Sequence, residues 1–327
     1  MGAVRDVCVI GLGLVGGSVL RAASAAGRTA WGATESTVDA KAAASEPEFA
    51  TATTDIAAAL KRASETDALV VLAVPLTAVD EVLRLVAKHA PGCLLTDVTS
   101  VKAPVAESVS RIVPGARFVG GHPMAGTAES GWAAGSATLF SGAAWVACVE
   151  EDTDLAAWRE VAMLALDAGA HVIPLAPAAH DEVVARVSHL PHLLAAVLSS
   201  VGAMGGPLAA ALAAGSFADG TRVAATRPDL VLAMTEGNRA ALLPVLDEAL
   251  GKLGAARGSL ASTGGLSATV EAGYQGKAAL AKHAAASRAS VRIDLGAPEA
   301  RDGLIALGER GGCVTALDGD ILIGEVA

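Results

Sequence analysis

The chain has 327 residues, of which 53% are hydrophobic and 18% are charged, and its net charge is −10. This composition excludes a disordered chain and can fill the cores of two domains. The negative charge repels polyanions, so we expect no nucleic-acid partner. The four cysteines are far apart in sequence, which predicts buried thiols and favours the reducing cytoplasm.

No charged leader followed by an apolar segment precedes the first strand-like run at residues 4–10, so we expect no secretory targeting segment. The uncharged stretch at residues 193–218 is long enough to cross a bilayer, but glycines and Pro207 interrupt it between residues 202 and 207. These breaks favour short helices in a subunit interface, and no membrane partner is expected.

Short β-rich runs alternate with helical patterns in the first half of the chain. The predicted strands cover residues 7–10, 29–33, 68–74, 94–97, 117–120, 143–149 and 171–175. This alternation is typical of a doubly wound, mostly parallel sheet of the Rossmann type. We therefore predict an α/β dinucleotide-binding domain over residues 1–176.

The strand pattern then stops. Long Ala- and Leu-rich segments over residues 177–288 predict an all-α domain, and its uncharged stretch at residues 193–218 predicts a homodimer formed through it. Residues 289–327 combine an alternating run, a helical run and a turn at residues 318–320, which predicts a short α/β appendage. We expect so small an appendage to pack on the helical domain or on a partner subunit.

A glycine-rich turn joins the first strand to the first helix, with the sequence Gly11-Leu12-Gly13-Leu14-Val15-Gly16. The first glycine allows the tight turn, the second lets the backbone approach a pyrophosphate, and the third lets helix and strand pack closely. The N-terminus of the helix then faces the anion. These six residues predict a dinucleotide site.

Two further segments are predicted to border the cofactor. Thr34 and Glu35 follow the second strand, where an acidic side chain binds the ribose hydroxyls. Glu35 at that position repels a 2′-phosphate and favours NAD, whereas Thr34 at that position tolerates NADP, so NADP is not excluded. Ala73-Val74-Pro75 ends the third strand, where its proline either borders the crevice or only terminates the strand.

Candidate catalytic residues follow the next two strands. Thr99, expected against the cofactor, and Ser100 come after the strand at residues 94–97, and His122 lies in a glycine-flanked loop after residue 120. Ligands bind outside the carboxyl ends of parallel strands, so we expect Ser100 and His122 to face the crevice. A neutral imidazole is a suitable proton acceptor there because its reference pKa is about 6.5.

These motifs, in this order, resemble the prephenate and arogenate dehydrogenase family of tyrosine biosynthesis. The resemblance includes Asp97 with Ser100-Val101-Lys102, Gly121-His122-Pro123-Met124-Ala125-Gly126, Ser188-His189-Leu190-Pro191-His192 and Asp219-Gly220-Thr221-Arg222. It implies an oxidative decarboxylation, in which hydride passes from prephenate to NAD and the ring loses carbon dioxide as it becomes aromatic. The product is 4-hydroxyphenylpyruvate, or tyrosine where arogenate is the substrate.

The resemblance also implies roles for individual residues. His122 matches the catalytic histidine, and Ser100 matches the serine that orients it by a hydrogen bond, with a helix N-cap as the alternative. Arg222 matches the arginine that binds a substrate carboxylate, with a surface ion pair as the alternative. His192 and His189, one helical turn apart, are expected to face the substrate, although either fits a core histidine. No metal is expected.

Departures from the family pattern leave the substrate open. Some relatives have an acidic residue where this chain has Ala128 and a tryptophan where it has Val231, so prephenate and arogenate both stay as alternatives. A hydroxyacid dehydrogenase of similar fold uses a lysine in its helical domain, but no lysine lies between Lys102 and Lys252. A non-catalytic nucleotide-sensing protein, the more distant alternative, has no need of His122.

Overall fold

The computed structural model describes residues 4–127 and 129–327, so Ala128, one of the departures noted above, lies outside the described residues. The chain forms two compact units. Of the described residues, the first unit contains 4–127, 129–181 and 290–326, and the helical unit contains residues 182–289.

The first unit is built on a five-stranded parallel sheet with the order β2-β1-β3-β4-β5. Its strands are β1 (Val7–Ile10), β2 (Ala30–Ala33), β3 (Leu69–Leu72), β4 (Leu94–Asp97) and β5 (Arg117–Val119). In β1, Val7 pairs with Ala30 of β2 on one side and with Leu69 of β3 on the other. The predicted Rossmann-type fold is confirmed.

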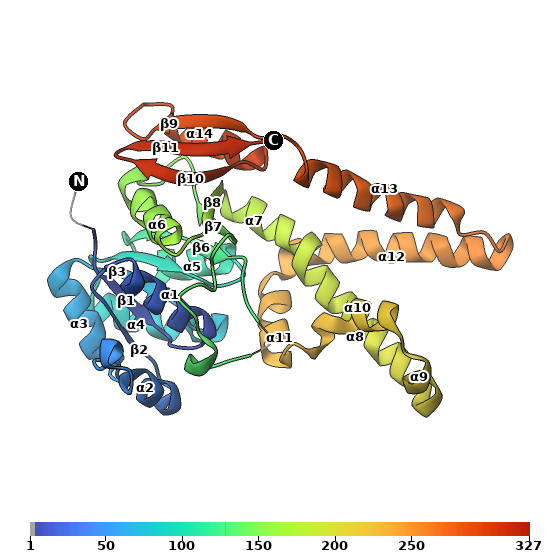
Figure 1. Cartoon of the computed structure of the whole chain (residues 1–327), viewed down its shortest axis with the longest axis horizontal. Helices are drawn as coiled ribbons and strands as arrows, with labels where there is room; N and C mark the ends of the chain where they lie inside the picture. Colours follow the sequence, from blue (N-terminus) through green and yellow to red (C-terminus); the bar gives the residue numbers. More distant parts are fainter. Residues whose placement is uncertain (1–3, 128) are drawn as a thin grey trace. The chain divides into compact units, whose positions relative to one another are not determined.

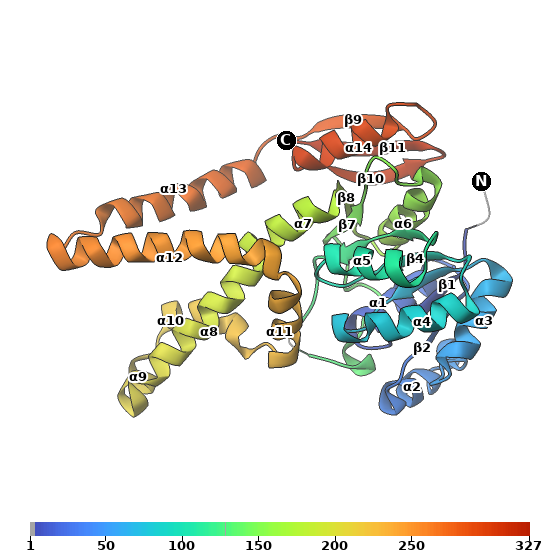
Figure 2. The ribbon, with the colours of Figure 1, turned by 180° about the vertical axis from the view of Figure 1, so that it is seen from behind.

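Helices cover both faces of this sheet because successive side chains of a strand point to opposite faces. Val7 and Val9 pack with α1 (Leu14–Ala25) in one apolar cluster. Cys8 and Ile10 pack in a second cluster with three helices, α3 (Ile56–Thr66), α4 (Val79–His89) and α5 (Ala103–Ile112). Figures 1 and 2 show the two helical layers from opposite sides, with α2 (Thr37–Ala44) beyond β2.

A second sheet in the first unit has six strands in the order β6-β7-β8-β10-β11-β9. Its strands are β6 (Gly121–Pro123), β7 (Ala144–Cys148), β8 (His171–Leu175), β9 (Ala289–Asp294), β10 (Cys313–Asp318) and β11 (Ile321–Val326). Strands β7 and β8 were predicted to belong to the mostly parallel sheet, but they lie in this separate mixed sheet. The core between the sheets includes α6 (Leu155–Asp167) and α14 (Ala300–Glu309).

The C-terminal appendage packs on the first unit, so the expectation that it packs on the helical domain is wrong. Strand β10 pairs with β8 through Val314 and Val172, which are both fully buried. The physical reason is that β8 would otherwise present an open edge, and pairing with β10 satisfies its backbone groups. Figure 1 shows β9, β10 and β11 beside α14.

The helical unit begins within α7 (Pro177–Val184) and continues with a π-helical turn at Ala185–His189. Its helices are α8 (Leu190–Ala203), α9 (Gly206–Leu212), α10 (Gly215–Thr221), α11 (Pro228–Gly237), α12 (Arg239–Ser262) and α13 (Ser267–Ala284). The uncharged stretch breaks after Ala203, as predicted. Among the described residues one helix, Pro177–Ala203, is long and apolar enough to span a membrane by length and composition.

Few apolar side chains of the helical unit are buried. Its buried hydrophobic residues are Val184, Ala185, Ala195, Leu242 and Val245. By contrast, almost all the exposed large hydrophobic residues of the described chain lie in this unit, the exceptions being Val4, Val38 and Met124. A monomer therefore leaves most of the apolar surface of these helices in water.

Candidate active site

The glycine-rich turn has the geometry that its sequence predicts. Gly11 has a φ of +101°, and a Cβ on it would lie 2.3 Å from the carbonyl oxygen of Ala73. A Cβ on Gly16 would lie 1.9 Å from the carbonyl oxygen of Gly11, so only glycine lets α1 start this close to β1. A Cβ on Gly13 would meet no atom within 4 Å. The turn therefore fits a dinucleotide, with open space beside the second glycine for a pyrophosphate.

The other predicted cofactor residues of this turn differ in exposure. Leu12 is fully buried, so its side chain is not available to a ligand. Leu14 and Val15, in the first turn of α1, are half-buried, and no side chain caps this helix. Val74 and Pro75 follow β3; Val74 is half-buried and Pro75 is exposed. The first turn of α1 is thus open to an anion that its backbone N–H groups would bind.

The end of β2 bears on the choice between NAD and NADP. Thr34 is buried directly after the strand, whereas Glu35 is exposed. Arg28, which precedes the strand, has a fully buried guanidinium whose Nε donates to Asp167 at 2.7 Å. This arginine is therefore not available to a 2′-phosphate.

A buried ion pair holds the backbone just before His122. Asp97, the last residue of β4, and Lys102 form an ion pair with side chains that are 0% and 1% exposed. Lys102 Nζ also donates to the carbonyl oxygen of Gly121 at 2.6 Å, and Asp97 Oδ1 accepts the N–H of Gly121 at 3.1 Å. Thr99 Oγ1 lies 2.5 Å from Asp97 Oδ2, so its hydroxyl serves this cluster. Both backbone polar groups of Gly121 are thereby fixed by charged partners.

His122 lies in a strand, not in the predicted loop. It pairs with Val146 of the antiparallel neighbour β7, and the bonds to Gly121 described above explain why the chain is extended here. Its Nδ1 lies 2.8 Å from Nε2 of His180, with the two rings edge to face. His180 Nδ1 lies 2.8 Å from Oδ1 of Asp181. Two histidines and a carboxylate therefore form one hydrogen-bonded chain inside the first unit.

Asp181 anchors this chain to α5. Its two carboxylate oxygens accept the backbone N–H groups of Lys102 and Ala103 at 2.8 and 2.9 Å. Burial raises the pKa of Asp181, but the hydrogen bonds from His180 and from these backbone groups outweigh it and hold the pKa below its usual value. The carboxylate is thus ionised at neutral pH, at the positive end of a helix.

Ser100 does not have the partner that the sequence predicts. Its hydroxyl makes no hydrogen bond to any residue that the structure describes, and His122 Nδ1 is bonded to His180. The alternative role of Ser100 as the N-cap is wrong, because no side chain of the cap residue bonds α5 and Asp181 occupies that place. Ser100 is half-buried three residues after β4, so its hydroxyl is available to a ligand.

The predicted substrate residues lie in the helical unit. His192 Nδ1 lies 2.9 Å from the carbonyl oxygen of Ser188, and its ring is half-buried. His189 is fully buried, with Nδ1 3.0 Å from Nδ2 of Asn238. Arg222 is exposed at the start of a 3₁₀ turn and forms no ion pair with a described residue. The structure thus supports a core position for His189 and leaves Arg222 open to an anion.

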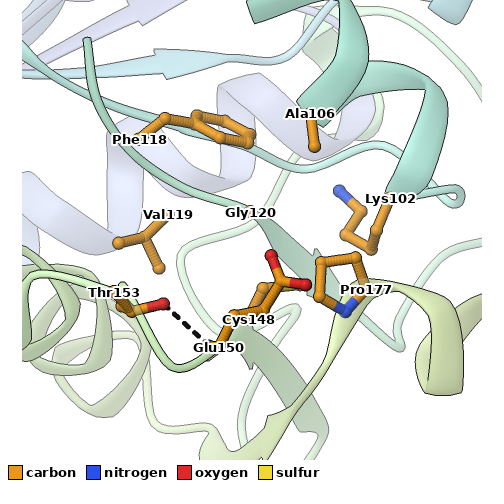
Figure 3. A pocket seen from close by; sticks show the side chains of 9 residues that line it. All are labelled: Lys102, Ala106, Phe118, Val119, Gly120, Cys148, Glu150, Thr153 and Pro177. Atoms are coloured by element: carbon orange, nitrogen blue, oxygen red, sulfur yellow. Dashed lines mark hydrogen bonds between the residues drawn. The ribbon is translucent and has the colours of Figure 1, made fainter. Parts of the chain in front are cut away.

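A small cavity has Lys102, Gly120 and Cys148 in its wall (Figure 3). Its volume of about 50 Å³ has room for water but not for a cyclohexadiene ring. Cys148 is fully buried, and burial raises the pKa of its thiol, so it is unreactive. The four cysteines form no disulfide with one another and are buried, as predicted.

Comparison with known proteins identifies the family. Residues 21–174 match the family model described as "Prephenate dehydrogenase, nucleotide-binding domain", and residues 176–264 match "Prephenate dehydrogenase, dimerization domain". The two segments together cover well over half of the chain. The chain belongs to the prephenate dehydrogenase family.

The similarity to individual proteins covers different fractions of the chain. A crystal structure of a Corynebacterium glutamicum protein, provisionally assigned as a prephenate dehydrogenase, is 43% identical, covers 94% of this chain and 97% of that chain, and has a TM-score of 0.88. The cyclohexadienyl dehydrogenase of Zymomonas mobilis is 32% identical over 80% of this chain and 90% of its own length. The prephenate dehydrogenase of Bacillus subtilis is 35% identical over 47% of this chain. The chain spans only 43% of the length of that Bacillus protein.

The sequence analysis missed His180, Asp181 and the buried role of Lys102. The available signal was the pair His180-Asp181, which follows the predicted strand at residues 171–175 by about one helical turn. The carboxyl end of that strand was expected at the same sheet edge as His122. The pair is separated from His122 by 58 positions, so the spacing gave no sign of contact.

Proposed function

We propose that this chain catalyses the NAD-dependent oxidative decarboxylation of prephenate to 4-hydroxyphenylpyruvate. The observation that carries the proposal is His122, which follows a residue fixed by Asp97 and Lys102 and whose ring bonds His180, in the same unit as a glycine turn that fits a dinucleotide. Membership of the prephenate dehydrogenase family supports it.

The six residues from Gly11 to Gly16 would hold the cofactor, with the space at Gly13 for its pyrophosphate. When bound, NAD supplies the hydride acceptor. Glu35 is exposed after β2, where its carboxylate would repel a 2′-phosphate. Arg28 is bonded to Asp167, so it would not bind that phosphate. NAD is therefore proposed over NADP.

His122 accepts the proton of the ring hydroxyl of prephenate as hydride leaves the ring carbon that bears this hydroxyl. Proton transfer to a positioned base contributes about 10²–10⁴ to the rate of such a step. The bond to the ring carboxylate then breaks, its electron pair enters the ring, and carbon dioxide leaves. Ser100, with a hydroxyl open to a ligand, is proposed to bond the same substrate hydroxyl. Thr99, Ala73 and Pro75 stay predicted as neighbours of the cofactor.

Prephenate is a dianion, and an acidic protein needs local cations to hold it. Arg222 is proposed to bind one carboxylate, since its planar guanidinium has no ion-pair partner among the described residues. His192 Nδ1 donates to a backbone carbonyl, so Nε2 is the nitrogen proposed to contact the substrate. It would accept a hydrogen bond when the ring is neutral and donate one only when the ring is charged. His189 is proposed to support the substrate site without touching the substrate, because its side chain is buried.

The helical unit is proposed to form a homodimer, and the protein to work in the cytoplasm. Few hydrophobic side chains of this unit are buried, and long exposed ones such as Val201, Leu253 and Leu260 run along its helices. A second copy would cover them, which agrees with the dimerization segment of the family model. The free buried cysteines favour a reducing compartment.

Initial rates of nicotinamide reduction with prephenate and arogenate, each with NAD and NADP, test the proposal. We expect the highest kcat/KM for prephenate with NAD. A higher value for arogenate would make tyrosine the product and overturn the substrate assignment. Cofactor binding without turnover of either acid would support the nucleotide-sensing alternative.

A further inference from the structure

We infer that His180, backed by Asp181, is a positioning residue that fixes the tautomer of His122 and so selects Nε2 as the nitrogen that accepts the substrate proton. The inference rests on the proposed role of His122 as the proton acceptor. It concerns a residue of α7 that the sequence motifs did not assign.

The hydrogen-bond chain determines where each proton lies. An ionised carboxylate only accepts hydrogen bonds, so His180 Nδ1 carries a proton and donates it to Asp181 at 2.8 Å. With the His180 ring neutral, its Nε2 has a lone pair and accepts. His122 Nδ1, 2.8 Å away, must then carry the proton and donate. The lone pair of neutral His122 is consequently on Nε2.

Several contacts make this arrangement rigid. Asp181 keeps both oxygens bonded to the first N–H groups of α5, so it cannot turn away from His180 without uncapping a helix. His180 and Asp181 are 1% and 4% exposed, so water does not compete for their hydrogen bonds. The other charged groups near His122, Asp97 and Lys102, pair with each other and with the backbone of Gly121.

The same chain stabilises the product of proton transfer. When His122 Nε2 accepts the substrate proton, the imidazolium donates from Nδ1 to His180, and the negative charge of Asp181 lies one ring further on. A partner that fixes ring orientation and favours the charged form raises the basicity of the acceptor. Loss of His180 should therefore lower kcat and move the acidic limb of its pH profile to lower pH.

A pair of substitutions separates this role from packing. His180→Phe fills the ring volume but has no acceptor for His122 Nδ1, whereas His180→Gln places an amide oxygen close to the position of Nε2. We expect His180→Phe to lower kcat about 10–100-fold with unchanged NAD affinity, and His180→Gln to recover most of that loss. His283→Asn, at an exposed position of α13, is the matched control and should change nothing.

Ring ¹⁵N NMR of the full chain, recorded without substrate, reads the tautomer directly. We expect the proton of neutral His122 on Nδ1 in the wild type and in His180→Gln, and a change toward Nε2 in His180→Phe. A wild-type proton on Nε2, or a His180→Phe variant with unchanged tautomer and kcat, would overturn the inference. Because the spectrum needs no turnover, it decides the inference even if prephenate is not the substrate or the Phe variant does not fold.

Discussion

The first unit and the helical unit bury their apolar side chains in opposite ways. In the first unit, both faces of the parallel sheet are covered by helices, and charged groups such as Asp97 and Lys102 are enclosed as a pair. In the helical unit, the core that is buried within one chain contains Ala185, Leu242 and Val245. The unit that holds His122 thus completes its own core, whereas the helical unit leaves most of its apolar side chains exposed in the single chain.

This difference agrees with the proposed division of roles, in which the first unit holds the proton acceptor and the helical unit binds a substrate carboxylate. A proton acceptor must be held to a fraction of an ångström, and the enclosed polar chain of the first unit provides that rigidity. Substrate carboxylates need an accessible cation, and Arg222 is exposed in the helical unit. Substitutions in the two units should therefore affect different constants.

The largest effect is expected from His122→Asn in the first unit. Removal of the proton acceptor should lower kcat by about 10³, within the range for general-base catalysis, because the loss lies in the transition state. The NAD dissociation constant, measured by calorimetry, should stay within about twofold of the wild-type value, since no binding contact is lost. A variant with a near-native kcat would remove His122 from the mechanism.

Val201→Glu in α8 tests the helical unit and should disrupt the proposed dimer. Val201 is 61% exposed in the single chain, and a charge buried without a partner in a dimer interface costs several kcal/mol, enough to weaken association by about 100-fold. Sedimentation velocity should show monomers. The control Val38→Glu, at an exposed valine of the first unit, should leave the dimer intact. A wild-type protein that sediments only as a monomer would rule out the proposed dimer.

Arg222→Ala should have a smaller effect, confined to substrate binding. Loss of a charge-assisted hydrogen bond of about 1.5–3 kcal/mol should raise the KM for prephenate about 10–100-fold. The kcat value should fall much less, and Arg222→Lys should recover only part of the loss. Steady-state rates over a range of prephenate concentrations measure this. An unchanged KM would assign the carboxylate contact to another residue.

The smallest effect is expected from Gly13→Ala. The added Cβ meets no protein atom within 4 Å, so the melting temperature should not change, while NAD affinity should fall about tenfold because the methyl group occupies the pyrophosphate space. Gly16→Ala is the matched contrast, because its Cβ would lie 1.9 Å from the carbonyl oxygen of Gly11 and should destabilise the fold itself. Equal NAD affinity in Gly13→Ala and wild type would place the pyrophosphate elsewhere.

The predictable parts of the fold were those set by neighbours in sequence. The glycine turn was predictable because Gly11, Gly13 and Gly16 fix the backbone locally, and the strands followed from short apolar runs. The break after Ala203 followed from Gly205 and Pro207 in the same way. These features need no knowledge of tertiary contacts.

The unpredictable parts depend on contacts between distant segments. The pairing of β10 with β8 joins residues 142 positions apart, Val172 and Val314, and nothing in either strand specifies the partner. The capping of α5 by Asp181 displaced Ser100 from its alternative role, and the ring of His122 bonds His180 through Nδ1. In each case a tertiary contact replaced the local one.

A single-turnover experiment tests the central claim most directly. The full chain, in excess over prephenate and saturated with NAD, is mixed with substrate, and NADH absorbance and released carbon dioxide are measured together. The proposed mechanism predicts equal amounts of both from the wild type, formed in one kinetic phase, and neither from His122→Asn on the same timescale. NADH without carbon dioxide, or both products at the wild-type rate from His122→Asn, would contradict it.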